Sequence, residues 1–136
     1  MRTILVVDDD MWVRGLARDL LAGEGYRVLE AADGQDAIRV AAEHPGPIHL
    51  LLTDVMMPGM NGCELATGLT TLMPSLKVMF MSAYDRDFLV ARGLQPCGPV
   101  ITKPFTVEYL LRRVQMVLGD QRAPTAASPR PAARAR

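Results

Sequence analysis

The chain has 136 residues, 49% of them hydrophobic, and a formal net charge of zero, which suits one globular domain and is too short for two. Its longest apolar runs are far below the ~20 residues of a membrane helix, and its N-terminus does not resemble a signal peptide. The cysteines, Cys63 and Cys97, lie far apart in the sequence and are expected to be reduced thiols of a cytoplasmic protein, not a disulfide or metal site.

Five short runs rich in Val, Ile and Leu recur along the chain. They lack clean alternation of apolar and polar residues, which is typical of strands buried on both faces of a parallel sheet. The strands predicted from these runs are residues 3–7, 26–30, 48–53, 76–81 and 99–102.

Helical patterns fill the intervals between the strands, each preceded by a polar residue that can cap a helix. The helix prediction has the least support between Ser82 and Val100. Only residues 85–92 have a helical pattern there, and a Gly/Pro-rich loop follows them. This alternation predicts an α/β layer sandwich with a parallel sheet. The predicted caps are Asp10, Asp33, Asn61 and Thr106, and the predicted stops are residues 23–25, 45–47, Pro74 and Gly119.

The last part of the chain differs in composition from the rest. Residues 1–119 carry a net charge of −3, whereas residues 120–136 carry +3 and contain no large apolar residue. Such a segment cannot bury enough surface to offset its ordering entropy. We therefore expect a domain over residues 1–119 and a disordered Pro/Ala/Arg tail over residues 120–136.

Acidic residues follow the first and third predicted strands. Asp8 and Asp9 come after residues 3–7, and Asp54 comes after residues 48–53. In a doubly wound sheet these strands are neighbours at the topological switch point, so the three carboxylates are expected to share a cleft. Carboxylates that close repel one another unless a cation joins them. Mg²⁺ fits, because it keeps several waters and uses only a few carboxylates.

Two more polar side chains end later strands. Lys103 follows residues 99–102 and offers a point charge for a phosphoryl oxygen, and Ser82 offers a hydroxyl in the same row. An Asp carboxylate can itself be a nucleophile that forms an aspartyl-phosphate. Metal, lysine and hydroxyl together supply the positioning and charge neutralisation that phosphoryl transfer needs.

These motifs together resemble the receiver domain of the two-component response-regulator family, over residues 2–119. The resemblance implies a flavodoxin-like (βα)5 three-layer sandwich with a parallel five-stranded sheet in the order 2-1-3-4-5, here with a short or irregular fourth helix. Within the family the chain is most similar to stand-alone receivers and to those at the C-termini of hybrid kinases. The matching stretches are Val7-Asp8-Asp9, Thr53-Asp54-Val55-Met56-Met57-Pro58-Gly59-Met60-Asn61-Gly62, Met81-Ser82-Ala83 and Lys103-Pro104-Phe105.

The resemblance also implies a role for each site residue. Asp54 would accept a phosphoryl group from the phosphohistidine of a histidine kinase or a histidine phosphotransfer domain. Asp8, Asp9, Asp54 and the backbone carbonyl of Met56 would hold Mg²⁺. Ser82 and Lys103 would contact the phosphoryl group, and the bond from Lys103 to Pro104 would be cis.

The same resemblance sets expectations for the protein as a whole. It would catalyse only its own phosphoryl transfer and slow dephosphorylation, so it would not be an enzyme. The downstream protein is left open. Direct DNA binding is not expected, because no output domain follows residue 119 of the sequence.

Two features depart from the family pattern. An aromatic residue often stands three positions before the lysine, and here that residue is Val100. The helix after Ser82 is also short. Both departures leave room for a degenerate receiver that binds partners without phosphorylation. A haloacid-dehalogenase-type phosphatase, using Asp8 and Asp10, is a weaker alternative because it leaves Asp54 unexplained.

Three more side chains, all close to these motifs in the sequence, have expected roles of their own. Met56 and Tyr84 stand two positions after Asp54 and Ser82, where receiver side chains control the access of water to the phosphoryl group. We expect this apolar pair to slow hydrolysis. Trp12 lies off the core face of the first predicted helix and is either an anchor for a kinase helix or a singly exposed aromatic.

Overall fold

Five parallel strands form one sheet in the computed structural model, which describes residues 1–120. The strands pair in the order β2-β1-β3-β4-β5, so the predicted topology is confirmed. The observed bounds of β1 equal the predicted ones, and those of the other strands differ from them by one or two residues. They are β1 (Thr3–Val7), β2 (Arg27–Ala31), β3 (Leu50–Asp54), β4 (Lys77–Ser82) and β5 (Val100–Thr102).

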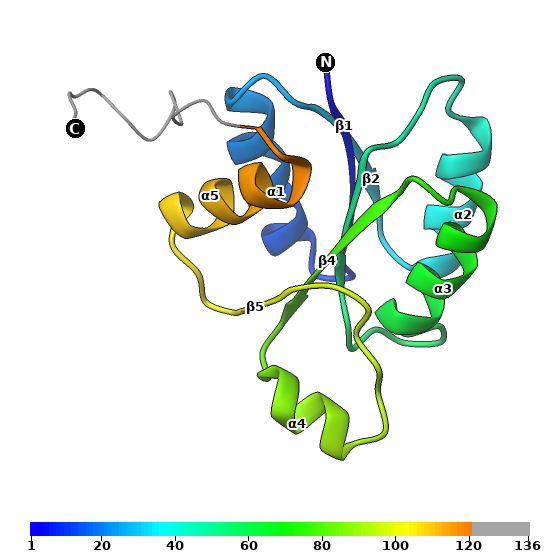
Figure 1. Cartoon of the computed structure of the whole chain (residues 1–136), viewed down its shortest axis with the longest axis vertical. Helices are drawn as coiled ribbons and strands as arrows, with labels where there is room; N and C mark the ends of the chain where they lie inside the picture. Colours follow the sequence, from blue (N-terminus) through cyan, green and yellow to red (C-terminus); the bar gives the residue numbers. More distant parts are fainter. Residues whose placement is uncertain (121–136) are drawn as a thin grey trace.

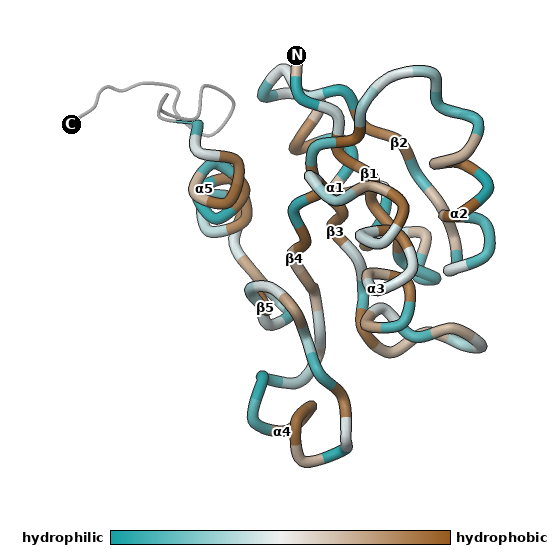
Figure 2. Tube along the Cα trace, turned by 45° about the vertical axis from the view of Figure 1, so that its right-hand side comes forward, coloured by the Kyte–Doolittle hydropathy of each residue, from teal (hydrophilic) through white to brown (hydrophobic). Residues whose placement is uncertain are grey.

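Helices cover both faces of this sheet (Figure 1). Helices α1 (Met11–Gly23) and α5 (Val107–Leu118) lie on one face, and α2 (Gly34–Glu43) and α3 (Gly62–Leu72) lie on the other. The hydrophobic colour in Figure 2 runs along the central strands between these helical layers. The arrangement is the predicted three-layer sandwich.

The burial of the central strands explains why apolar and polar residues do not alternate in the sequence runs that form them. Every residue of β1 and β3 is buried, because each face of the sheet has its own hydrophobic cluster. Leu5 and Leu51 belong to the cluster under α2 and α3, whereas Ile4 and Leu52 belong to the cluster under α1 and α5. In strands that are buried on both faces, polar side chains are confined to the strand ends.

Each helix begins at a polar cap whose side chain accepts a backbone N–H bond from the first turn. Asn61 and Glu64 form a reciprocal capping box at α3. Gly119 ends α5 in the left-handed conformation that glycine tolerates best. The five caps are Asp10, Asp33, Asn61, Asp85 and Thr106.

Helix α4 (Arg86–Ala91) has only six residues, as the sequence predicts. It projects beyond the carboxyl edge of the sheet and covers neither face (Figure 1). Leu89 is its fully buried residue and joins the cluster under α2 and α3. The helix is therefore attached to the body of the domain over a small area.

The described part of the chain ends at Asp120, one residue beyond the predicted domain. The Asp120 carboxylate lies 3.1 Å from a guanidinium nitrogen of Arg2 and accepts a 3.1 Å hydrogen bond from the hydroxyl of Tyr26. Asp120 thus links the end of α5 to residues that flank the amino ends of β1 and β2. The expectation of disorder for the remainder, residues 121–136, lies outside the described residues.

Candidate phosphoacceptor site

The three predicted acidic residues meet at the carboxyl edge of β1 and β3. Val7 pairs with Thr53 in the parallel register, which brings the ends of the two strands side by side. Carboxylate oxygens of Asp8, Asp9 and Asp54 all lie within 4.8 Å of one another. Asp8 and Asp54 are buried and Asp9 is exposed, so the cluster opens to solvent on one side.

Lys103 joins this cluster from the end of β5. Its ammonium lies 2.9 Å from Oδ2 of Asp8 and 3.5 Å from Oδ1 of Asp54. The Lys103 amide donates a 2.7 Å hydrogen bond to the carbonyl of Ser82, and its peptide bond to Pro104 is cis. Lys103 and Asp8, 95 positions apart in the sequence, are therefore in direct contact at one edge of the sheet.

The ionisation of these groups follows from their burial and mutual charge. Burial raises the pKa of Asp54 to about 6; the Lys103 ammonium opposes this rise, and the Asp8 and Asp9 carboxylates add to it. Burial alone would lower the pKa of Lys103, but its hydrogen bond to Asp8 and the charge of Asp54 raise it above its ordinary value. Asp54 is therefore mostly ionised at neutral pH while its lysine stays protonated.

Asp8 is held in place by contacts on both sides. Its Oδ1 accepts a 2.8 Å hydrogen bond from the amide of Asp10, which leaves Oδ2 turned toward Lys103. The carbonyl of Asp8 accepts a 2.7 Å hydrogen bond from the guanidinium of Arg14. Asp10 itself points away, because its carboxylate caps α1 by accepting from the amides of Trp12 and Val13.

Gly62 ends one of the stretches matched in the sequence, but the sequence assigned it no role at the site. A Cβ atom at this position would lie 2.2 Å from the carbonyl oxygen of Asp54, because the first turn of α3 packs directly on the end of β3. The Gly62 amide also donates a 2.8 Å hydrogen bond to the carbonyl of Val55. A glycine at the first helical position, directly after a capping asparagine, was the available signal.

Arg14 is the second residue that the sequence reasoning missed. Besides bonding to the carbonyl of Asp8, its guanidinium lies 3.4 Å from the carboxylate of Glu30. Arg14 is one of several charged residues in its helix, and no sequence pattern marked it as a contact of the acidic pair.

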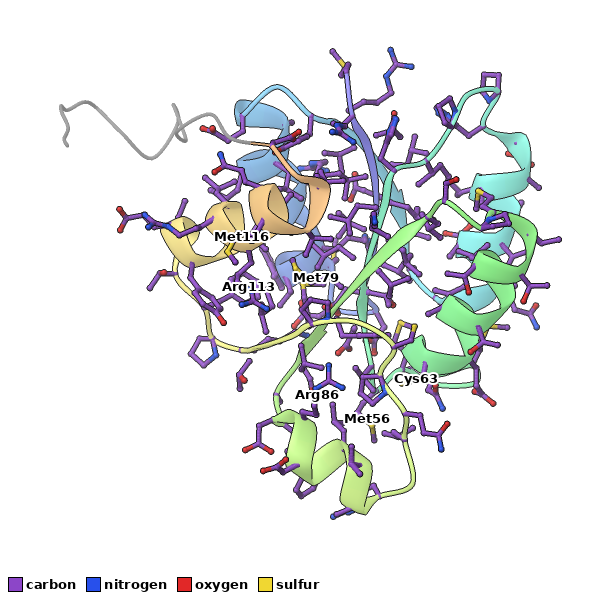
Figure 3. The ribbon with its side chains drawn as sticks, in the orientation of Figure 1. Met56, Cys63, Met79, Arg86, Arg113 and Met116 are labelled. Atoms are coloured by element: carbon purple, nitrogen blue, oxygen red, sulfur yellow. The ribbon has the colours of Figure 1, made fainter. Side chains whose placement is uncertain are left out.

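Ser82 and Met56 occupy different environments at the same edge. Ser82 is fully buried as the last residue of β4, and its hydroxyl accepts a 2.9 Å hydrogen bond from the amide of Tyr84. Met56 is 48% exposed and Tyr84 is 44% exposed, so both side chains flank the site from outside. Figure 3 shows Met56 at the lower edge of the sheet, on the side of α4.

The fold is a doubly wound parallel α/β sandwich, and the acidic cluster with its lysine lies at the carboxyl edge of the sheet. This is the edge where proteins of this class bind their ligands. A family model for the response regulator receiver domain matches residues 4–115. The chain belongs to this family.

Individual relatives support the same assignment. The response regulator receiver protein CpdR of Brucella abortus (strain 2308) is 34% identical over 119 residues, which cover 87% of this chain and 98% of CpdR. The crystal structure of the receiver domain from the hybrid histidine kinase CckA is 37% identical, with a TM-score of 0.72 and coverage of 85% and 98%. The response regulator TrrA from Thermotoga maritima, in complex with Mg(2+)-BeF, is 29% identical, with a TM-score of 0.72 and coverage of 87% and 100%.

Several relatives are longer than this chain. The chain spans 50% of the regulatory protein YbdJ of Bacillus subtilis (strain 168) and 13% of the sensor kinase CckA of Brucella abortus (strain 2308). Receiver domains thus occur among these relatives both alone and within larger signalling proteins. Among residues 1–120, no helix is long and apolar enough to cross a membrane.

Proposed function

We propose that this receiver domain accepts a phosphoryl group on Asp54 from the phosphohistidine of a histidine kinase or a histidine phosphotransfer domain. The observation that carries the proposal is the junction of Asp54 with Asp8 and Lys103, formed by residues from the ends of three strands. A buried carboxylate beside a lysine, open to solvent on one side, is suited to nucleophilic attack and not to packing.

The acidic cluster fits Mg²⁺ as a partner. Its donors are all oxygens, and three carboxylates face one ammonium among the described residues, which leaves an excess of negative charge at the site. We propose that Asp8, Asp9 and Asp54 hold the ion, with the backbone carbonyl of Met56 as a further ligand. When bound, Mg²⁺ supplies charge neutralisation for the oxygens of the phosphoryl group. The relative TrrA carries Mg(2+)-BeF in its crystal structure.

The residues of the chain then have defined roles in transfer. A carboxylate oxygen of Asp54 forms a bond to phosphorus while the bond from phosphorus to the imidazole nitrogen of the donor breaks, and the imidazole keeps the electron pair and takes up a proton. Lys103, already 3.5 Å from Asp54, pairs with a phosphoryl oxygen. Ser82 donates its hydroxyl hydrogen to another.

The function is that of a signalling module, not an enzyme that turns over a substrate. The chemistry is limited to modification of Asp54 and its slow hydrolysis. The alternative of a phosphatase requires Asp10 as a second acid, but the Asp10 carboxylate is used to cap α1. We propose that the protein acts in the cytoplasm through a downstream protein and does not contact DNA itself.

The first helix offers a surface for the phosphate donor. Met11, Trp12 and Leu16 are 66%, 82% and 55% exposed and lie on the helix that follows the acidic pair. These three exposed apolar side chains line one hollow of the surface, which is more than the scattered exposure of an ordinary surface. We propose that Trp12 anchors a helix of the kinase or phosphotransfer domain.

Incubation with acetyl phosphate, with and without Mg²⁺, tests the proposal. Intact mass spectrometry should show one added phosphoryl group in Mg²⁺, little in EDTA, and none in Asp54→Asn. Asp19→Asn, an exposed aspartate on α1, is the matched control and should behave as the wild type. An unmodified wild type in Mg²⁺ would overturn the proposal and favour a receiver that works without phosphorylation, the interpretation that short α4 and Val100 support.

A further inference from the structure

Asp9 has no side-chain support of its own at the acidic cluster. It is the exposed member of the three, and within residues 1–120 its carboxylate makes no hydrogen bond and no ion pair. The direction of this carboxylate therefore depends on the backbone that carries it, the turn from Asp8 to Asp10 between β1 and α1. In metal sites, the groups behind the ligands commonly fix the direction in which the ligands point.

The guanidinium of Arg14 holds the centre of this turn. It donates a 2.7 Å hydrogen bond to the carbonyl of Asp8, which belongs to the peptide group that leads into Asp9. Among the described residues no second hydrogen bond reaches that carbonyl. The other contacts of the turn lie on either side, because the Asp8 amide donates to the carbonyl of Ala31 at 3.3 Å and Asp8 Oδ1 accepts from the amide of Asp10 at 2.8 Å.

Arg14 is itself held by Glu30 on β2. Its Nε lies 3.4 Å from a carboxylate oxygen of Glu30, and the Arg14 side chain is only 19% exposed. Glu30 stands opposite Val6 in the parallel register of β1 and β2, so its carboxylate is carried by the sheet. A charge-assisted contact of this kind fixes the guanidinium and offsets part of its charge.

The charge of Arg14 cannot be what the metal site gains from it. Like charges repel, so a cation beside the acidic cluster weakens the binding of Mg²⁺ unless it contributes something else. The cluster already contacts one cation, the ammonium of Lys103. Arg14, in contrast, donates to a backbone carbonyl at this edge, and within the described part of the chain it forms no ion pair with Asp8, Asp9 or Asp54. Its contribution is therefore to the position of the ligands.

We propose that Arg14 is a positioning residue for the metal site: it fixes the peptide group between Asp8 and Asp9, and Glu30 fixes Arg14. The inference rests on the proposed function, because it concerns the Mg²⁺ that this function requires. Arg14 contacts neither the ion nor the phosphoryl group and acts through the direction of the Asp9 carboxylate. It raises the affinity for Mg²⁺ and leaves the maximal rate of phosphoryl transfer at saturating Mg²⁺ unchanged.

Isothermal titration with MgCl₂, in the absence of any phosphate donor, tests the inference. Arg14→Met removes the hydrogen bond, keeps the apolar stem, and should bind Mg²⁺ about ten-fold more weakly than the wild type. Removal of a charge alone would have the opposite sign, because it would tighten the binding of a cation. Arg14→Lys keeps a donor and should lie between the two, and Glu30→Gln, which releases the guanidinium, should also weaken binding.

The rate of labelling by acetyl phosphate adds a second measurement. In Arg14→Met the Mg²⁺ concentration that gives half the maximal rate should rise about ten-fold, and the maximal rate should stay at the wild-type value. A variant whose fold is damaged would instead lose maximal rate. Urea denaturation in EDTA shows that each variant is folded, and if Arg14→Met is not, the loss of affinity expected in Arg14→Lys and Glu30→Gln carries the test.

Arg18→Met is the matched control. Arg18 lies on the same helix and pairs with the same carboxylate of Glu30 at 3.0 Å, but its contacts are Glu30 and Asp19 and not the turn that carries Asp9. It should bind Mg²⁺ as the wild type does. Unchanged or tighter binding in Arg14→Met, or an equal loss in Arg18→Met, would overturn the role of Arg14 alone. A wild type that binds no Mg²⁺ would contradict the proposed metal site and this role with it.

Discussion

The acceptor site and the α4 segment share one edge of the sheet but are held in opposite ways. Asp8, Asp54 and Lys103 come from three strands and contact one another at 2.9 and 3.5 Å. Helix α4 follows a single strand and is anchored by Leu89, by hydrogen bonds from Arg86 to the loop after the helix, and by two partly exposed aromatic rings that stack. The site is fixed by long-range packing, and the segment beside it by local contacts.

This difference suits the two regions to different tasks. Phosphoryl transfer needs charged groups that are already in position, because reorganising them would add to the barrier. A segment that reports the reaction must change at a small energetic cost, and such segments come from the least stable parts of a fold. Substitutions in the two regions should therefore differ in size and in what they change.

The largest effect is expected at the junction of α3 with the acceptor strand. Gly62→Ala places a Cβ 2.2 Å from the backbone oxygen of Asp54, and neither backbone segment can yield easily. We expect a loss of about 3 kcal/mol in the free energy of unfolding, as for severe overpacking. Urea denaturation measures it.

Gly68→Ala is the control on the same helix. Nothing lies within 4 Å of a Cβ at that position, so the alanine should stabilise the protein by up to about 1 kcal/mol through helix propensity. Similar effects of the two substitutions would contradict the close contact at Gly62.

A smaller effect is expected from the charge of Asp54. Its pKa is about 6 in the folded protein against an ordinary value of 3.8, so the folded state binds this proton more tightly than the unfolded state. The wild type therefore loses stability as the pH rises from the ordinary pKa to the folded one. Without Mg²⁺, Asp54→Asn should be more stable than the wild type by about 2 kcal/mol near neutral pH.

The pH dependence separates this charge effect from packing. The advantage of Asp54→Asn should shrink as the pH falls toward about 4, where the wild-type carboxyl is protonated in the folded state. Urea denaturation in EDTA across this range measures it, and Mg²⁺ should reduce the advantage by binding the folded wild type. An advantage that is the same at every pH would contradict the raised pKa.

Most of the acceptor site could be predicted because its residues follow from the arrangement of strands. Once the runs that end at Asp8, Asp54 and Lys103 are recognised as strands of one parallel sheet, their carboxyl ends must meet at one edge. Four of the five caps were predicted for a related reason, since a cap depends only on residues within one turn of it.

Contacts that depend on side-chain direction could not be predicted in the same way. The sequence marked Ser82 and Tyr84 separately, but the hydrogen bond from the Tyr84 amide to the serine hydroxyl depends on how the loop turns. The approach of Gly62 to Asp54 depends on the angle at which α3 leaves the loop, which no periodic pattern encodes.

A moderate effect is expected at the rim of the site. Met56 and Tyr84 are 48% and 44% exposed beside Asp54 and Ser82, and their apolar side chains should hinder the approach of water to the phosphoryl group. The double variant Met56→Ala, Tyr84→Ala should shorten the lifetime of phosphorylated Asp54 several-fold, which corresponds to about 1 kcal/mol in the barrier.

Loss of the phosphoryl group after acetyl phosphate is removed gives this lifetime. Met116→Ala is the control, because Met116 is also an exposed methionine, at 64%, but lies on α5. A lifetime in the double variant equal to that of the control would show that the rim does not limit hydrolysis.

The smallest effect on global stability is expected at Arg86, although it should change α4 the most. Arg86→Ala removes the hydrogen bonds to the carbonyls of Pro96 and Gly98, and water can replace them at this exposed position. The free energy of unfolding should therefore fall by only about 0.5 kcal/mol, while hydrogen exchange across α4 becomes faster. Arg112→Ala, at an exposed position of α5, should change neither quantity. A large global loss in Arg86→Ala would mean that α4 is part of the cooperative core, and the contrast between a fixed site and a yielding neighbour would then fail.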